Sequence, residues 1–503
     1  MSSYNFKHIS NSFSQDDGLP FSEMLSEETI NRVAEEAGVA PPPPPPPSPS
    51  AATESTKSNT KSDDKSDEMI YTPAVTLWAW LSQVLHIGPQ RSCVAAVARV
   101  GVLCAALGRP LPSPDTGAYC RARQRLPLVL IQRLTYHVAE QAEAQVPETW
   151  LWKGRHVHLV DGTTATTPDT PSLQATFPQS NSQKPGLGQP IIRLVVLMSL
   201  ATAMVTGMAM GPYAGKETGE TALFRQLLER LKPGDVVLAD RFFCSYFLVA
   251  ILRALGVDVV TRLHQRRKAD FRRGRKLGHG DHVVTWRRPA CPDWMEQTTY
   301  ESIPETIEVR EVFVHVHQPG FRVESLIVVT SLLDAETYPR DDIAELYHKR
   351  WLVELDINSL KTTLGMDVLT CKSPALVEKE IWTCLLAYNL IRLTMLQAAL
   401  KAQVSPRQLS FAAAMENIAA SYEVRVVLAG KLADLPGEHT NFLVAMATLL
   451  TTALLRAIAS HRVGNRPGRV EPRAVKRRPK PHKLLTVPRA EARAKIRAGT
   501  TAD

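Results

Sequence analysis

Apolar and polar positions divide the first third of the chain into two segments. Residues 1–70 are polar and include a proline run at 41–47. They hold too little apolar surface to offset the entropy of ordering, so we predict a disordered segment with a stiff polyproline spacer. From 71 to 150, apolar residues recur at helical spacing, for example at Leu77, Leu81 and Leu85. This spacing predicts a small helical domain, whose arginines either contact DNA or lie on a solvated helix face.

From residue 151 the pattern changes to short apolar runs typical of strands. Three strands are predicted first, and helices then alternate with strands. This is the element order of an RNase H-like fold. The predicted strands are 156–161, 191–200, 203–210, 236–240 and 257–263, and the predicted helices are 220–231 and 243–255.

A different pattern follows the second helix and strand. β-branched residues alternate with polar ones at 308–317 and 323–332, which predicts a β-rich insertion. A long helix at 340–364 then resumes the earlier order. We therefore predict an α/β protein with an RNase H-like catalytic core at 151–263 and 339–372, a β-rich insertion at 264–338, a C-terminal helical region at 373–461 and a basic tail at 462–503.

Charge and cysteine usage narrow the class of protein. The 503 residues carry a net charge of +9, which suits a polyanionic partner but is also common in proteins that bind none. Seven scattered cysteines without a C-x-x-C pair argue against a disulfide framework or a zinc site. The longest apolar runs, 93–107 and 442–455, fall short of the ~20 residues of a membrane span, and the N-terminus lacks a signal-peptide pattern. We expect a cytoplasmic protein that does not enter a membrane.

Two aspartates follow apolar runs directly. Asp161 follows HVHLV and Asp240 follows DVVLA. If the two strands lie side by side, the carboxylates meet at one edge of the sheet, where they repel unless a cation neutralises them. This pattern indicates a site for a hard cation. The alternative is that each aspartate ends a strand and begins a turn.

Four residues of the helix at 340–364 have a spacing that places them on one face. Tyr347, Arg350, Glu354 and Lys361 are separated by three, four and seven residues. At ~100° per residue they fall within about a 60° arc. An aromatic ring, two cations and a carboxylate thus lie beside the apolar stripe of the helix. A helix stabilised by surface ion pairs would explain the same geometry.

At these residues the chain resembles a known family. The stretch YHKRWLVELDINSLK at 347–361 is similar to the YREK signature of the insertion-sequence family four of DDE transposases. DGTT at 161–164 and ADRFF at 239–243 resemble the two aspartate blocks of this family. The resemblance covers about 155–372. It implies that Asp161, Asp240 and Glu354 hold two Mg²⁺ ions, with Mn²⁺ as a substitute, and catalyse DNA cleavage and strand transfer.

The resemblance also implies the partners. They are the double-stranded terminal inverted repeats of an insertion sequence and the target DNA, bound by a homodimer in a synaptic complex on the bacterial nucleoid. Tyr347, Arg350 and Lys361 would hold phosphates near the cleaved end. Trp286 or Trp294 would stack on a flipped base, although either could equally be a core residue of the insertion. A basic cluster would contact the DNA backbone, unless it is an exposed loop without a ligand; it comprises Arg266, Arg267, Lys268, Arg272, Arg273, Arg275 and Lys276.

Two alternatives remain at this stage. One is an RNase H-like nuclease that cuts without strand transfer, and the other is a catalytically inactive DNA-binding protein derived from a transposase. The β-rich insertion and the YREK residues favour a transposase over a simple nuclease, and the intact triad favours an active enzyme. Asp169 and Glu220 lie in the catalytic region, but we assign them no chemical role.

Overall fold

A computed structural model describes residues 21–22, 24–39, 70–315, 325–433, 440–463 and 487–498. The proline run at 41–47 and most of the basic tail lie outside the described residues. The chain forms two compact units. The first comprises residues 1–144, 359–366 and 375–463, and the second comprises 145–358, 367–374 and 464–503. The helical segments that we predicted before and after the catalytic core therefore belong to one unit.

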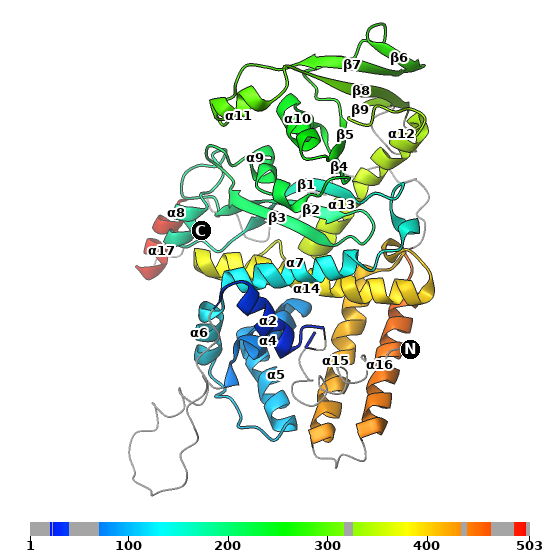
Figure 1. Ribbon diagram of the computed structural model, residues 1–503. Coiled ribbons are helices and arrows are strands. Elements are labelled where there is room, and N and C mark those ends of the chain that lie inside the picture. The colour runs from blue at the N-terminus through cyan, green and yellow to red at the C-terminus, as the bar shows by residue number, and fades with distance from the viewer. Residues whose placement is uncertain are drawn as a thin grey trace, which may run out of the picture. The chain divides into compact units, whose positions relative to one another are not determined.

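The second unit is built on a single nine-stranded sheet (Figure 1). Its first five strands have the spatial order β3-β2-β1-β4-β5. β1 pairs antiparallel with β2 and parallel with β4, and β4 pairs parallel with β5. This is the predicted RNase H-like arrangement. The five strands are β1 (Val157–Thr166), β2 (Ile191–Ser199), β3 (Val205–Pro212), β4 (Val236–Ala239) and β5 (Asp258–Arg262).

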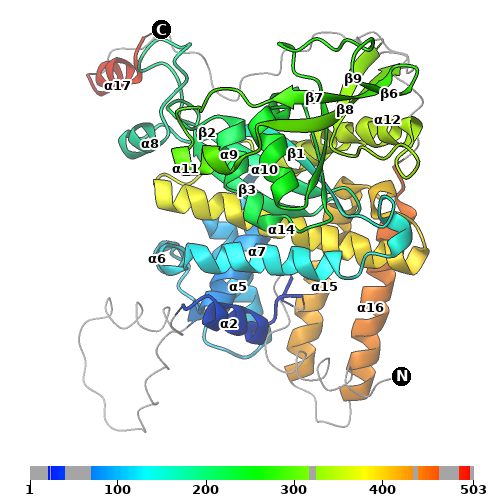
Figure 2. The ribbon, with the colours of Figure 1, turned by 45° about the horizontal axis from the view of Figure 1, so that its top comes forward.

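The insertion continues this sheet without a break. β5 pairs antiparallel with β9, and the order then runs β9-β8-β7-β6. Figures 1 and 2 show α12 (Arg340–His348) beside β9, so the helix that follows the insertion packs against its last strand. The inserted strands are β6 (Arg275–Gly278), β7 (Asp281–Arg287), β8 (Thr306–His315) and β9 (Ser325–Thr330), with α11 (Gln297–Ser302) between β7 and β8.

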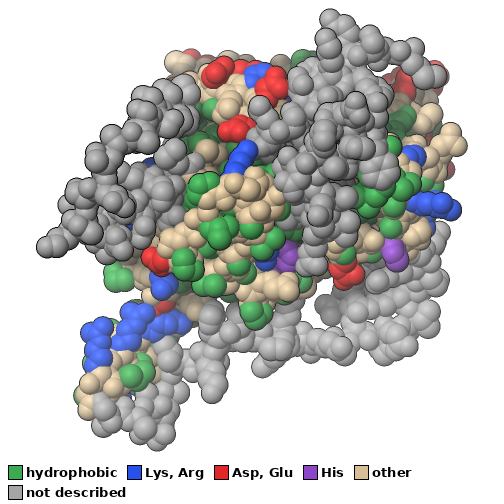
Figure 3. Space-filling model, turned by 90° about the horizontal axis from the view of Figure 1, so that it is seen from below, with side chains coloured by type: hydrophobic (Ala, Val, Ile, Leu, Met, Phe, Trp, Pro, Cys, Tyr) green, Lys and Arg blue, Asp and Glu red, His purple; other side chains and the backbone are tan. Residues whose placement is uncertain are grey.

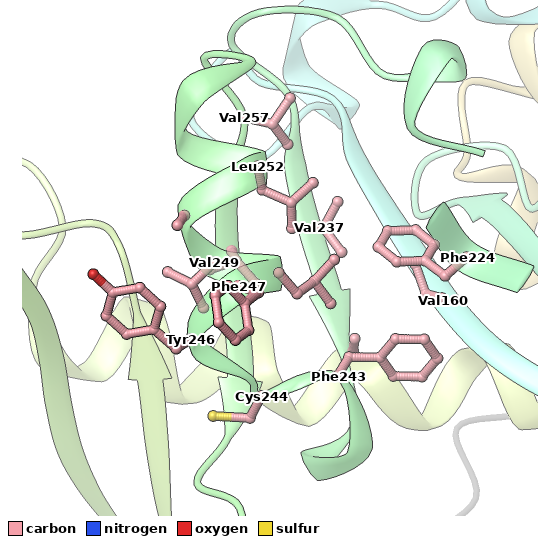
Figure 4. Close-up of a cluster of buried hydrophobic side chains, with 14 of the residues drawn as sticks. Val160, Phe224, Val237, Phe243, Cys244, Tyr246, Phe247, Val249, Leu252 and Val257 are labelled. Atoms are coloured by element: carbon pink, nitrogen blue, oxygen red, sulfur yellow. The ribbon is translucent and has the colours of Figure 1, made fainter. Parts of the chain in front are cut away.

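Buried side chains from the sheet and two helices form a hydrophobic core (Figure 4). Val160 of β1 and Val237 of β4 meet Phe224 of α9 (Glu220–Arg225). Phe247 and Leu252 add the apolar side of α10 (Tyr246–Ala254). α10 begins at this place because the Ser245 hydroxyl accepts a hydrogen bond from the Leu248 N–H at 3.2 Å. Packing of both helices on the sheet fixes the strand ends that carry the aspartates.

One buried ion pair joins two strands of the insertion, and its arginine also bonds to the segment before α12. Arg310 of β8 is 0% exposed, and it donates two hydrogen bonds to the Asp281 carboxylate, at 2.8 and 2.5 Å. A third bond, 2.7 Å long, goes to the carbonyl oxygen of Tyr338. Because only Pro339 separates residue 338 from α12, Arg310 sets where that helix begins relative to the inserted strands.

The other unit consists of helices. α2 (Glu27–Glu36) corrects the prediction that residues 1–70 lack order. Ser26 caps it by accepting a hydrogen bond from the Thr29 N–H, and Ile30 and Val33 are buried. Trp78 also donates a hydrogen bond to the Leu25 carbonyl oxygen. The remaining helices are α4 (Pro73–Leu85), α5 (Cys93–Ala106), α6 (Gly117–Arg125), α7 (Leu128–Glu143), α14 (Pro374–Ala402), α15 (Phe411–Ala433) and α16 (Thr440–Ser460).

α14 is long and apolar enough to cross a membrane, but 89% of its most apolar window is buried inside the structure. Asn389 of α14 donates a hydrogen bond to the Thr135 carbonyl oxygen of α7, as expected for a core helix. Apolar side chains also reach the surface of this unit, including Val94 on α5 and Leu449 on α16. Figure 3 shows the molecule from below, with hydrophobic side chains among the atoms at the centre of the view.

Two predicted helices are shorter than their apolar spacing suggested. The segment 220–231 is α9 followed by a 3-10 turn at Leu228–Arg230. The segment 340–364 comprises α12, a 3-10 turn at Lys349–Trp351, α13 (Leu352–Asn358) and a π-helical turn at Ser359–Thr363. The π turn is closed by a hydrogen bond from the Leu364 N–H to the Ser359 carbonyl oxygen at 2.9 Å. Such turns change the helical period, so spacing alone could not place residues beyond 358.

The described end of the basic tail is a helix. α17 (Arg489–Arg497) lies beside α8 (Pro171–Thr176) in Figures 1 and 2. Arg489 forms an ion pair with Asp169 at 3.3 Å, and its N–H donates to the Gly186 carbonyl oxygen. Asp169, to which we had assigned no chemical role, therefore anchors this helix on the connection between β1 and β2.

Candidate active site

The two aspartates lie side by side at the point where two parallel strands stop pairing. β1 pairs with β4 from Val157 to Val160, and Val160 is opposite Ala239. Asp161 and Asp240 are the next residue on each strand. Because neighbouring strands lie ~4.8 Å apart, both side chains belong to one edge of the sheet. We had predicted that the strand ends at Asp161. In the structure β1 continues to Thr166 in its pairing with β2.

Each aspartate is oriented by a backbone amide. The Gly162 N–H donates to Asp161 Oδ1 at 2.8 Å, and the Phe242 N–H donates to Asp240 Oδ1 at 2.7 Å. Asp240 thereby caps the 3-10 turn at Arg241–Phe243. One oxygen of each carboxylate is held in this way, so the direction of the other oxygen is set by the backbone.

Burial and neighbouring carboxylates raise the pKa of Asp161 to about 6. Burial is the largest cause, and the charges of Asp240 and Glu220 raise this pKa further. The hydrogen bond from Gly162 and the charge of Arg350 act in the opposite direction. An ionised Asp161 is thus destabilised until a cation comes close, and oxygen donors are the ligands that hard divalent cations prefer. The donor set fits such a cation.

Glu354 lies on α13, which packs against β1. Arg350 Nη2 donates a hydrogen bond to Glu354 Oε1 at 2.7 Å. Within the described ranges, no three His, Cys, Asp or Glu side chains are grouped so that they could hold a metal ion. The Glu354 carboxylate is bonded to Arg350 instead, whose charge also acts on Asp161.

Tyr347 is 8% exposed and lies close to the same groups. Burial raises its pKa to about 12, Arg350 and Arg262 act to lower it, and Asp240 raises it. The structure therefore brings Tyr347, Arg350 and Glu354 together beside the aspartates. Lys361 lies in the π-helical turn, which belongs to the helical unit.

Of the two tryptophans considered for base stacking, Trp286 is a core residue. It is 5% exposed, and its indole N–H donates to Glu311 Oε1 at 3.4 Å. The guanidinium of Arg267 lies 3.9 Å from the centre of its ring. Both the burial and the stacked cation leave no face for a base, which corrects the prediction for this residue.

Trp294 lines a hollow next to the Asp240 turn. The hollow has a volume of about 480 Å³ and is bordered by Phe242, which is 54% exposed. The guanidinium carbon of Arg225 lies 3.8 Å from the centre of the Trp294 ring, on which it stacks. Arg225 and Phe242 were not among the predicted site residues, although an aromatic residue two positions after Asp240 was visible in ADRFF. The charged lining residues are Arg225, His264, Arg266 and Arg267.

The rest of the basic cluster is exposed on the loop after β5 and on β6. Arg272 and Arg273 have side chains that are 91% and 85% exposed, and both pair with Asp270. Arg266, Lys268, Arg275 and Lys276 are also exposed. The cluster thus presents cations to solvent, except for Arg267, which covers Trp286.

Comparisons with known proteins identify the family to which this part of the chain is similar. The Transposase DDE domain family matches residues 152–390, a range that contains both aspartates and Glu354. Transposase InsG for insertion sequence element IS4, from Escherichia coli strain K12, is 29% identical over 74% of this chain and 78% of its own length. The putative transposase InsZ of the same organism is also 29% identical, over 28% of this chain and 46% of its own length.

Among solved structures, a piggyBac transposase synaptic complex with hairpin DNA matches with a TM-score of 0.38 and 10% identity, over 90% of this chain and 89% of that one. The catalytic unit and its family match define the chain as a DDE transposase, an enzyme that cuts and joins DNA. It belongs with the IS4-like transposases, to which InsG belongs. Enzymes of this class use divalent metal ions, and their partner is DNA.

Proposed function

We propose that this transposase acts on the terminal inverted repeats of its own insertion sequence, with Asp161, Asp240 and Glu354 as the carboxylates of one catalytic site. The observation that carries this proposal is the register of β1 and β4. It places Asp161 and Asp240 at the same level on neighbouring strands, while α13 brings Glu354 against β1. We assign catalysis to residues 151–263 and 339–372.

The three carboxylates would hold two Mg²⁺ ions, for which Mn²⁺ substitutes. Two such ions activate an attacking oxygen and stabilise the leaving oxygen in phosphodiester displacement. The residues of the chain provide the ligands and their orientation. Gly162 and Phe242 hold one oxygen of each aspartate through backbone amides. Arg350 holds Glu354 in its paired position.

Tyr347, Arg350 and Lys361 would contact phosphates near the cleaved end. Arg350 is suited to this role because its side chain is only 19% exposed, pairs with Glu354 and lies close enough to Asp161 for the two charges to interact. A half-buried guanidinium binds a phosphate more strongly than an exposed one, because less water competes. Tyr347 is buried beside it, so the two side chains form one surface.

Arg350→Ala should slow cleavage at the transposon end about 10- to 100-fold, because a hydrogen bond to a charged group contributes ~1.5–3 kcal/mol. Binding to random duplex DNA should be almost unchanged. The two quantities are measured by single-turnover cleavage and by gel shift. Lys349→Ala is the matched control, since Lys349 is its sequence neighbour and pairs with the exposed Glu345. An equal loss of cleavage and random binding would make Arg350 a generic backbone contact.

The hollow lined by Trp294 and Phe242 would accept a base flipped out of the cleaved end. An aromatic ring for stacking and three arginines for the adjoining phosphates are the chemistry that such a nucleotide requires. The exposed cluster from Arg266 to Lys276 would bind the DNA backbone beyond it. Binding through this cluster is independent of sequence and weakens as salt concentration rises.

An insertion sequence has two ends, and each must be cut and joined at one catalytic site. We therefore propose a homodimer within a synaptic complex, one protomer for each end. The enzyme would work in the bacterial cytoplasm on the DNA of the nucleoid, where both the insertion sequence and its target lie.

The decisive test incubates the purified protein and Mg²⁺ with DNA that carries the inverted repeats flanking its own gene. We expect nicks that leave a 3′-OH at the transposon end, followed by hairpins or joined products, which separate on a denaturing gel. Nicks that never lead to joined products would instead support a nuclease. Binding without any cleavage would support an inactive DNA-binding protein.

A further inference from the structure

We propose that Glu220 is a fourth carboxylate of the catalytic site and binds a divalent metal beside Asp161. This inference rests on the proposed role of Asp161 as a metal ligand. Glu220 is the first residue of α9, between β3 and β4, and sequence patterns alone assigned it no role.

The carboxyl group of Glu220 reaches the catalytic edge through a gap that only glycine leaves open. Gly162 directly follows Asp161 on β1. A Cβ atom at residue 162 would lie 2.4 Å from both Cδ and Oε1 of Glu220. Gly162 is not among the glycines with positive φ, so its backbone conformation does not require glycine. The close approach of Glu220 is therefore the physical reason for glycine at this position.

Glu220 lacks the hydrogen bonds that the two aspartates have. Asp161 and Asp240 each accept a bond from a backbone amide. In the part of the chain that the structure describes, Glu220 accepts none and forms no ion pair, although its side chain is half-buried. A half-buried carboxylate without a donor is destabilised, and a bound cation would relieve this cost.

Arg193 of β2 positions the start of α9. It donates a hydrogen bond to the Thr218 carbonyl oxygen at 2.7 Å, two residues before Glu220. It also lies 4.6 Å from the centre of the Tyr213 ring, which limits its movement. Arg193 therefore fixes the backbone that carries Glu220. Its charge also acts to lower the pKa of the Glu220 carboxyl group, against the larger effect of burial, which raises that pKa.

Mn²⁺ binding to the full-length protein without DNA tests the proposal, because it is independent of cleavage. Free Mn²⁺ is counted by electron paramagnetic resonance for the wild type and for Glu220→Gln, which keeps the shape of the side chain. Glu229→Gln is the matched control, since Glu229 is an exposed carboxylate a few residues further along. Asp161→Asn is the reference for loss of the site, and thermal melting confirms that every variant folds.

We expect Glu220→Gln to weaken Mn²⁺ binding about tenfold or more, as removal of a supporting ligand does at other metal sites. Glu229→Gln should bind as the wild type does. Gly162→Ala should reproduce the loss, because the added methyl group displaces the Glu220 carboxyl group.

Unchanged Mn²⁺ binding by Glu220→Gln, together with a loss in Asp161→Asn, would overturn the role of Glu220 and leave the proposed catalytic triad intact. Unchanged binding by both variants would overturn both assignments. A loss in Glu220→Gln that Glu229→Gln shares would reduce the effect to one of overall charge, which also contradicts the proposal.

Discussion

Asp161→Asn, Asp240→Asn and Glu354→Gln should each reduce metal-dependent cleavage of transposon ends by on the order of 10³-fold or more, while end binding stays largely intact. Metal ions contribute several kcal/mol of charge stabilisation to phosphodiester displacement, and each ~1.4 kcal/mol corresponds to tenfold in rate. An amide keeps the size of the side chain but loses the negative charge that holds the cation. The measurements are single-turnover cleavage with Mg²⁺ and gel shift of the same DNA.

Asp293→Asn serves as the control for this series, because Asp293 is exposed in the insertion and has no part in the site. It should cleave as the wild type does. Retained cleavage in any one of the three variants would remove that residue from the catalytic site.

Arg310→Ala should destabilise the catalytic unit by ~3–5 kcal/mol, because it leaves the buried carboxylate of Asp281 without its partner. Asp281 is only 4% exposed, and both of its oxygens are bonded to Arg310. The variant also loses the bond to the Tyr338 carbonyl oxygen, which precedes α12. The midpoint of urea unfolding, followed by tryptophan fluorescence, measures the change.

Two further variants show whether burial of the ion pair is the reason for the loss of stability. Arg272→Ala removes an arginine from an exposed pair with Asp270 and should leave the unfolding midpoint unchanged. Arg310→Met combined with Asp281→Leu replaces both charges by apolar groups and should recover most of the lost stability. If the single Arg310→Ala variant unfolds at the wild-type midpoint, the pair has no structural role.

The sequence predicted the catalytic edge because its signals are local. An apolar run followed by aspartate, at Asp161 and again at Asp240, marks the end of a buried stretch. Tyr347, Arg350 and Glu354 lie close together in the structure, as their spacing predicted, because they span only about two helical turns. A 3-10 turn within that span shifts each residue only slightly.

Features that depend on contacts between distant segments could not be predicted in this way. Glu220 approaches Gly162 only because α9 packs on β2 and β3, and nothing near residue 220 indicates that approach. Trp286 reads as an aromatic residue on an alternating strand, but whether Arg267 or a base covers it depends on the path of a loop. α2 was missed because the polar average of residues 1–70 conceals a short group of apolar positions at Leu25, Ile30 and Val33.

The continuous sheet bears on the search for a minimal version of this enzyme. The strand β9 closes the edge of β5 through the pairs Val260 with Thr330 and Thr261 with Val329. Excising the insertion would leave an apolar strand edge of the catalytic core open to other chains, which invites aggregation. A truncated enzyme would therefore have to keep β9, or replace it with a designed edge strand. The insertion is therefore an integral part of the catalytic sheet and cannot be removed as a separate domain.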